Sequence, residues 1–142
     1  MRYFANIVLS ATTILAITGL IYYFLAPLNW GAGEYIMHLH LWLGFVFMGY
    51  FIFNIPKHIQ TNIKKINNPM FKYVAYSLLT AFTITLISGF LHFIPYVSYF
   101  FKPVYYRFET YDFISFIHLI SAVLVIVLVI SHILLSPLKD KK

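Results

Sequence analysis

The sequence predicts an all-α integral membrane protein, a single four-helix bundle with up-down-up-down topology over residues 1–142. Of the 142 residues, 61% are hydrophobic and only 10% are charged, whereas a soluble domain carries about 25% charged residues. Four runs without Asp, Glu, Lys or Arg cover residues 3–33, 35–56, 73–101 and 113–138. Each run is longer than the ~20 residues that a helix needs to cross the hydrocarbon core of a membrane.

The prolines mark where the predicted helices end. The first helix is expected from about residue 4 to 26, before Pro27, and the second from about 34 to 55, where Pro56 breaks or kinks it. The third is expected from about 71 to 94, before Pro95, and the fourth from about 111 to 136, before Pro137. A basic start before an apolar run is also typical of a signal peptide. The first run is too long for one and no convincing cleavage site follows it, so we retain it as a helix.

The positive charges predict the orientation in the membrane. Only Lys102 and Arg107 lie on one side of the predicted bundle, and eight Lys or Arg residues lie on the other. Short cytoplasmic loops carry the excess of Lys and Arg, so both termini are expected in the cytoplasm. The eight residues are Arg2, Lys57, Lys64, Lys65, Lys72, Lys139, Lys141 and Lys142. An interfacial belt is expected at the opposite face, from Trp30, Tyr35, Tyr96, Tyr99, Tyr105 and Tyr106. The loop 95–110 there suits packing on a partner or a plain interfacial position.

The composition also excludes several classes of function. Without cysteine the chain has no disulfide, iron–sulfur ligand or catalytic thiol. No Gly-rich phosphate loop, paired carboxylates or Ser/His/Asp set is present, and no internal repeat is visible. The net charge of +6 lies at helix ends, so no nucleic-acid partner is expected. Six histidines are therefore the main chemical resource of the chain.

His118 and His132 give the strongest single signal. They lie on one helix, about 40° apart around its axis and about 21 Å apart along it. One helix thus presents two imidazoles to two levels of the membrane. Imidazole is the usual nitrogen ligand of haem iron, so this spacing favours two haems stacked across the bilayer.

The second helix provides a partner for His118 at the same depth. His38 and His40 lie about 200° apart, so at most one of them faces the bundle. We choose His40, because it shares a face with Gly44, Asn54 and His58, and a glycine beside a ligand leaves room for a porphyrin. The outer haem is then expected between His40 and His118, and His38 is interpreted as an interfacial side chain.

The inner haem is expected on His132 with His58. His58 follows His40 by about 27 Å along a straight helix, which is lower than His132, unless Pro56 bends the chain back. The alternative is that His58 is an interfacial residue among lysines. His92 is interpreted as a packed bundle histidine, with a role at the outer site as the alternative.

These residues resemble a family, the four-helix cytochrome b subunits of membrane-bound formate dehydrogenases and nickel–iron hydrogenases, and smaller bacterial cytochrome-b-like proteins. The resemblance rests on HLWLG from His40, on SLLTAFTITLISGFLHFIPY in the third helix, and on the His-x13-His element IHLISAVLVIVLVISH in the fourth. The first helix contributes only ITGL around Gly19.

The resemblance implies that His40 and His118 bind the outer haem and that His132 binds the inner one. In that family the partner of His132 comes from the start of the first helix, but the matching position here is near Ala5. The smaller relatives carry histidines 14 and 18 residues after the first one of the second helix, where this chain has Asn54 and His58. This favours His58 as a replacement ligand, with a one-haem protein as the alternative.

The family's role implies a haem b protein of the bacterial inner membrane that relays electrons between a partner enzyme and the quinone pool, as one subunit of a quinone-linked oxidoreductase. The partner is expected to be a periplasmic or membrane subunit of iron–sulfur or cytochrome c type; the oligomeric state stays open. The implied quinone site lies near the cytoplasmic haem, where Asn54, Lys72, Tyr76 and Ser77 offer polar contacts. Two rivals are a non-haem anchor or assembly subunit with interhelical histidines, and a small transporter, which is the weaker because the prolines lie at helix ends rather than at mid-membrane.

Overall fold

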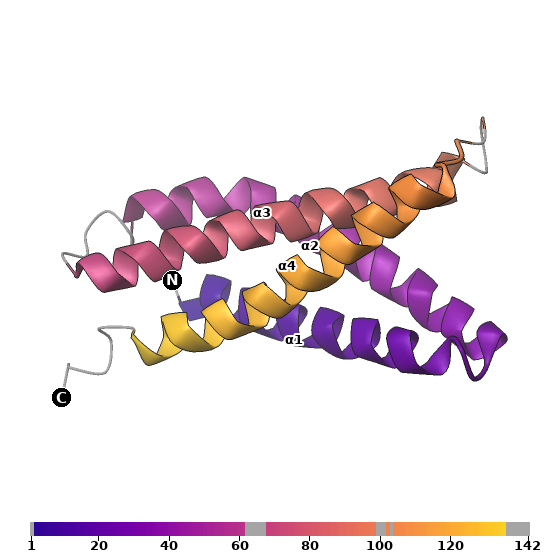
Figure 1. Ribbon diagram of the computed structural model, residues 1–142. Helices are drawn as coiled ribbons and strands as arrows, with labels where there is room; N and C mark the ends of the chain where they lie inside the picture. The colour runs from indigo at the N-terminus through magenta and orange to yellow at the C-terminus, as the bar shows by residue number, and fades with distance from the viewer. Residues whose placement is uncertain (1, 62–67, 99–101, 103, 136–142) are drawn as a thin grey trace. The chain divides into compact units, whose positions relative to one another are not determined.

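The computed structural model describes residues 2–61, 68–98, 102 and 104–135, which form four α-helices (Figure 1). The helices are α1 (Arg2–Leu25), α2 (Trp30–Thr61), α3 (Pro69–Ser98) and α4 (Phe108–Leu134). All four are long and apolar enough to cross a membrane, so the prediction of an all-helical chain with four helices capable of spanning a membrane is confirmed. Some residues of the predictions lie outside the described part: Lys64, Lys65, Tyr99, Pro137, Lys139, Lys141 and Lys142, as well as the side chains of Arg2 and Ala5.

Asparagine residues cap the beginnings of α2 and α3. The Asn29 side-chain oxygen accepts the backbone N–H of Ala32 at 3.1 Å, so α2 begins at Trp30 rather than near residue 34. Asn68 likewise accepts the N–H of Phe71 at 3.2 Å, and Pro69 takes the first helical position, where its missing N–H costs nothing. Both caps supply an acceptor to backbone donors that have no partner inside the helix.

Two prolines lie within helices instead of ending them. Pro56 lies inside α2, which continues to Thr61, and Pro95 lies inside α3, which continues to Ser98. A proline removes one backbone hydrogen bond, which long membrane helices tolerate when neighbouring groups satisfy the backbone. At the end of α3 the Ser98 hydroxyl donates to the Pro95 carbonyl at 3.0 Å and accepts the N–H of Val104 at 2.9 Å.

The chain divides into two compact units. The first contains α1, α2 as far as Asn54, and residues 93–104; the second contains the rest of α2, α3 as far as His92, and α4. In the first unit α1 and α2 run antiparallel, because Ile7 and Tyr50 line one groove while Ala26 lies against Gly33. In the second unit α3 and α4 run antiparallel, because Phe71 packs on His132 and His92 packs on Tyr111.

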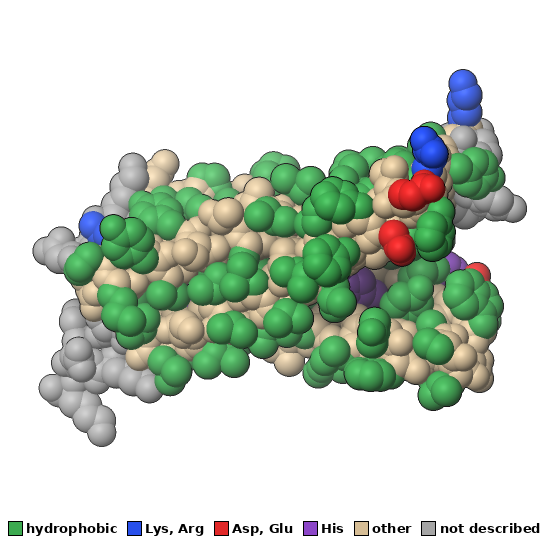
Figure 2. Space-filling view, in the orientation of Figure 1, with side chains coloured by type: hydrophobic (Ala, Val, Ile, Leu, Met, Phe, Trp, Pro, Cys, Tyr) green, Lys and Arg blue, Asp and Glu red, His purple; other side chains and the backbone are tan. Residues whose placement is uncertain are grey.

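Few side chains are buried in either unit. The first unit buries Phe47, Phe51 and Phe93, and the second buries Phe71, Ala75, Ala81, Phe82, Ile114 and Val125. Many large apolar side chains are instead exposed, and hydrophobic side chains cover most of the face seen in Figure 2. Phe53 and Leu28, for example, are 85% and 84% exposed. Such a surface is unfavourable in water and suits contact with lipid.

Gly33 marks the tightest approach between α1 and α2. A Cβ atom at this position would lie 2.7 Å from the Ala26 Cα, so Gly33→Ala forces the backbone to shift. We expect the substitution to lower the free energy of unfolding by about 1–3 kcal/mol, as overpacking does. At Gly31 the nearest atom would lie at 3.8 Å, so Gly31→Ala is the matched control. Thermal unfolding in detergent, followed by circular dichroism, measures both; equal stability of the two variants would contradict the close approach.

Candidate functional site

His40 lies on α2 and contacts the middle of α1 within the first unit. Its Nδ1 is 2.9 Å from the Thr18 hydroxyl oxygen. The same hydroxyl donates its hydrogen to the carbonyls of Ile14 and Leu15, at 2.9 Å and 3.1 Å. When that hydrogen lies on either carbonyl, the Thr18 oxygen accepts a hydrogen bond from His40, whose Nδ1 then carries the imidazole proton.

A glycine beside Thr18 lets the His40 ring approach α1. A Cβ atom at Gly19 would lie 3.2 Å from the His40 Cε1, closer than an ordinary van der Waals contact. Gly44, which the sequence suggested as the glycine that leaves room for a porphyrin, faces a different neighbour: a Cβ atom there would meet Leu15 at an ordinary 3.9 Å. The space for the ring of His40 comes from Gly19 on α1.

His118 lies on α4 and contacts α3 in the second unit. Its Nδ1 is 3.1 Å from the Thr85 carbonyl oxygen and 3.1 Å from the Ser88 hydroxyl oxygen. A carbonyl only accepts, so Nδ1 of His118 carries the proton. The Ser88 hydroxyl in turn donates to the Ile84 carbonyl at 2.8 Å. Ser88 is buried, so water does not compete for these bonds.

The ring of His118 also lies against a glycine. A Cβ atom at Gly89 would lie 3.1 Å from the His118 Cε1. In both units, therefore, Nδ1 of an imidazole lies within hydrogen-bond distance of an oxygen of the facing helix, and the ring edge lies against a glycine. Where Nδ1 is the donor, the second ring nitrogen, Nε2, carries the lone pair.

His92 belongs to the surroundings of His118. The two rings are 5.9 Å apart in an edge-to-face arrangement, and the Tyr111 ring lies 4.9 Å from that of His92. Nε2 of His92 is 3.5 Å from the Ser115 hydroxyl, which is the outer limit of a hydrogen bond. His92 is thus packed within the second unit, as one of the two sequence interpretations expects.

His132 and His58 fall together in the second unit. Both belong to that unit, and the Phe71 ring lies 4.6 Å from that of His132. Nδ1 of His132 is buried and has no hydrogen-bond partner among the residues that the structure describes. A buried polar atom without a partner is unfavourable and calls for an explanation. His132 therefore differs from His40 and His118, whose Nδ1 atoms are hydrogen-bonded.

The remaining predicted residues have ordinary contacts. The ring of His38 lies 4.9 Å from that of Tyr96, at the edge of an aromatic group with Trp42 and Phe93. The Asn54 amide donates to the Tyr50 carbonyl at 2.8 Å. Asn54 belongs to the first unit, while Lys72, Tyr76 and Ser77 belong to the second. The suggested quinone contacts are thus not brought together within one unit.

The ligand sets that sequence reasoning predicted stand as follows. His132 and His58 share the second unit, whereas His40 and His118 belong to different units, so their pairing on one iron stays a prediction. No three His, Asp or Glu side chains in the described ranges are grouped closely enough to hold a metal ion. Haem iron takes only two axial ligands from the protein. A haem site therefore needs a pair of histidines and not a group of three ligands.

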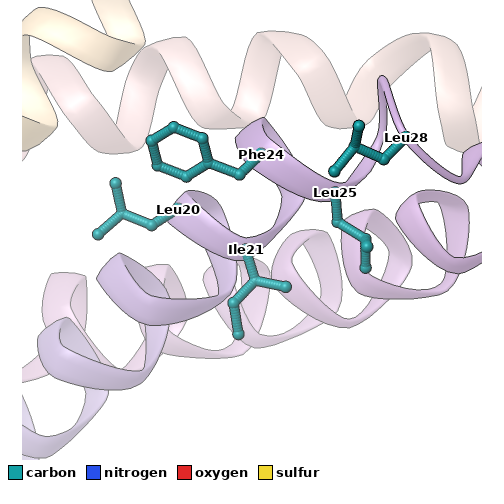
Figure 3. Close-up of a pocket in the computed structure, with 5 residues that line it drawn as sticks. All are labelled: Leu20, Ile21, Phe24, Leu25 and Leu28. Atoms are coloured by element: carbon teal, nitrogen blue, oxygen red, sulfur yellow. The ribbon is translucent and has the colours of Figure 1, made fainter.

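The surface grooves of the first unit lie away from the histidines. Leu20, Ile21, Phe24, Leu25 and Leu28 line a shallow groove along α1 and the turn after it (Figure 3). A second groove lies between α1 and α2 and is lined by Ile7, Ala11, Ile14, Leu15, Leu43, Val46, Phe47 and Tyr50. Both linings are apolar or aromatic, which suits lipid chains and offers no nitrogen ligand.

Sequence reasoning missed the hydroxyl partners of the two imidazoles. Thr18 and Ser88 each directly precede a glycine, Gly19 and Gly89. This shared dipeptide pattern, a hydroxyl residue followed by glycine in an apolar run, was the available signal. It is short and common, and only the facing histidine gives it a meaning.

Alanine substitutions at the glycines test whether the rings lie against α1 and α3. At Gly49 an added Cβ atom would meet nothing within 4 Å, so Gly49→Ala is expected to stabilise the protein by about 0.5–1 kcal/mol, through the lost flexibility of glycine. Gly19→Ala and Gly89→Ala displace His40 and His118, so we expect them to be about 1–2 kcal/mol less stable than Gly49→Ala. Thermal unfolding in detergent measures the order. An equal gain at all three positions would mean that neither ring lies against its glycine.

A comparison with known protein families, curated proteins and solved structures finds no match to this chain. The resemblance to cytochrome b subunits, which rests on short motifs, therefore stays a prediction. The functional argument rests on the contacts of the histidines.

Proposed function

We propose that the protein is a b-type haem cytochrome that relays electrons between a partner redox enzyme and the membrane quinone pool. His40 and His118 are the proposed axial ligands. The observation that carries the proposal is a contact: each Nδ1 lies within hydrogen-bond distance of an oxygen of the facing helix. A proton on Nδ1 leaves each Nε2 with the lone pair that binds iron.

The contacts match those of metal-binding histidines in general. A histidine that binds a metal almost always donates its other ring N–H to a carbonyl, a carboxylate or water, which fixes the ring orientation and raises the basicity of the ligating nitrogen. The Thr85 carbonyl does this for His118, and the Thr18 hydroxyl does it for His40. The residues present therefore fit an axial haem ligand at both positions.

Bound haem supplies one-electron chemistry that no side chain of this cysteine-free chain offers. The chain's own part is to hold the two imidazoles by their Nδ1 protons and to exclude water. The helices that carry His40 and His118 have long uncharged runs, so the groups around the imidazoles are largely apolar. The glycines at positions 19 and 89 keep side-chain atoms off the ring edges.

Support for the second, inner haem is smaller. His132 has the right spacing from His118, and His58 lies in the same unit. Among the described residues, however, His132 lacks the Nδ1 partner that His40 and His118 have. We therefore propose one haem on His40 and His118 as the minimum, with His132 and His58 as the ligands of a second.

Quinone and a partner subunit complete the proposal. Lys72, Tyr76 and Ser77 lie in the first turns of α3, on the side where the positive-inside rule puts the cytoplasm. The quinone is proposed to bind on that side. The connections between the helices are too short to hold a second redox domain, so the electron donor or acceptor is proposed to be a separate subunit.

A second candidate function is a non-haem anchor or assembly subunit. The bonds from His40 to Thr18 and from His118 to Ser88 are themselves hydrogen bonds between helices. Such bonds stabilise membrane helix pairs without any cofactor, by about 0.6 kcal/mol on average. The presence or absence of haem distinguishes the two candidates.

An absorbance spectrum of the purified protein tests the cytochrome proposal. We expect an α-band of b-type haem after reduction with dithionite, and a pyridine haemochrome assay gives the haem content per chain. His118→Ala and His40→Ala remove a ligand and are each expected to abolish the outer haem. His38→Ala is the matched control, since His38 lies two residues from His40 on α2 and packs on Tyr96. A colourless wild-type protein would overturn the proposal, and loss of haem in His38→Ala but not in His40→Ala would reassign the ligand.

The proposed orientation, with both termini in the cytoplasm, is tested by labelling. The chain has no cysteine. Labelling of a single cysteine introduced at Lys102 or at Lys142 therefore shows on which side of the membrane that position lies. In intact cells a membrane-impermeant maleimide is expected to label the Lys102→Cys variant, and the Lys142→Cys variant only after lysis. The reverse pattern would invert the topology.

A further inference from the structure

The same small device holds an imidazole in each of the two units. On α1 the device is Thr18 followed by Gly19, facing His40. On α3 it is Ser88 followed by Gly89, facing His118. In both cases the hydroxyl contacts Nδ1 and the glycine faces the ring atom Cε1.

The hydroxyls of Thr18 and Ser88 donate to carbonyls of their own helices in the same pattern. Thr18 donates to the carbonyls three and four residues before it, Leu15 and Ile14. Ser88 donates to the carbonyls at the same two spacings, those of Thr85 and Ile84. A side chain bound in this manner to its own helix turns its oxygen lone pairs outward. Where the hydroxyl hydrogen lies on these carbonyls, the facing imidazole meets an acceptor and presents an N–H.

The two helix pairs are therefore structural repeats around these histidines, although no repeat is visible in the sequence. The separation from hydroxyl to histidine is 22 residues in the first copy and 30 in the second. The difference arises between the hydroxyl residue and the start of the next helix: α3 continues farther past Ser88 than α1 does past Thr18, and the connection after α3 is also longer. Because the two separations differ, comparing the sequence with itself at one fixed offset does not reveal the repeat.

We propose that Thr18 is a positioning residue that holds His40 in the Nδ1–H tautomer and so keeps the lone pair on Nε2, and that Ser88 assists the Thr85 carbonyl in the same role at His118. In the protein without haem, the tautomer reports on these contacts, because iron bound at Nε2 would by itself leave the proton on Nδ1. The consequence of the contacts for the haem rests on the proposed function. An Nδ1–H bond to oxygen makes imidazole a stronger donor, which favours ferric iron and lowers the midpoint potential.

The experiment reads the tautomers directly. The full chain, labelled with ¹⁵N-histidine and prepared without haem, is studied in detergent micelles by NMR. The ring nitrogen shifts show which nitrogen carries the proton, and single histidine substitutions assign them. We expect protonated Nδ1 for His40 and His118 in the wild-type protein. Protonated Nε2 at either residue overturns the proposal for that residue without any further variant.

Thr18→Val removes the acceptor and keeps the shape of the side chain. We expect a shift of the His40 nitrogens away from the Nδ1–H pattern, unchanged His118 nitrogens and, where haem is bound, a higher midpoint potential. Thr18→Ser restores the hydroxyl and the wild-type pattern. Thr13→Val is the control, because Thr13 is an exposed α1 residue whose hydroxyl donates to the Leu9 carbonyl. If Thr18→Val does not fold, Thr18→Ala removes the same acceptor.

Ser88→Ala tests the second copy. The Thr85 carbonyl remains as an acceptor for His118, so we expect the Nδ1–H tautomer to persist, with a smaller shift of the nitrogens than Thr18→Val causes at His40. Thr83→Val is the control on α3, since the Thr83 hydroxyl is exposed and donates to Leu79.

The outcomes separate this proposal from the proposed function. A protein without haem in which Thr18→Val changes the His40 tautomer supports the positioning role and overturns the cytochrome. A haem protein in which Thr18→Val changes neither tautomer nor midpoint potential, or in which Thr13→Val causes the same change, supports the cytochrome and overturns the positioning role.

Discussion

The arrangement of the histidines depends on one constraint, which is that a polar group in hydrocarbon has to find its hydrogen-bond partner within the protein. In the middle of an apolar helix pair, no water is available to accept a hydrogen bond from an imidazole N–H. His40 meets the Thr18 hydroxyl, and His118 meets the Thr85 carbonyl and the Ser88 hydroxyl. Satisfying one ring nitrogen in this way determines the state of the other. The same hydrogen bond thus stabilises the helix pair and prepares the imidazole to act as a ligand.

The same constraint explains why small residues matter more here than a large core. Lipid is as apolar as leucine, so helices gain little by burying large side chains and associate through close packing instead. Many large apolar residues are accordingly exposed, and the buried residues include the small side chains of Thr18, Ser88, Ser121, Ala75 and Ala81 beside several phenylalanines. An added Cβ atom would come within 3.2 Å of a neighbouring atom at Gly19, Gly33 and Gly89. The small residues set which parts of the helices meet, and the hydroxyls among them set which polar groups are satisfied.

At the other end of α4, the Nδ1 of His132 lacks, among the described residues, the hydrogen-bond partner that His118 has. Its spacing from His118 equals that of Asn54 from His40, 14 residues in each case (132 − 118 and 54 − 40). Asn54 satisfies its amide on its own helix, by donating to Tyr50. The imidazole of His132 is the larger group, and its buried Nδ1 has no partner in the described parts of the chain. The two helix pairs are therefore alike around one histidine each and differ at the second level, where the case for a haem ligand is correspondingly smaller.

The sequence by itself determined the class of the protein. Four uncharged runs predict four membrane helices, because the desolvation of charge in lipid is costly, and the structure confirms them. The six histidines stood out for the same reason. Helix ends were less predictable: Asn29 starts α2 before Glu34, and α2 and α3 continue past Pro56 and Pro95. Only the tertiary structure decided what faces each imidazole. In the sequence, Thr18 and Ser88 do not differ from any other serine or threonine in an apolar helix. Their role arises solely from the helix that packs against them.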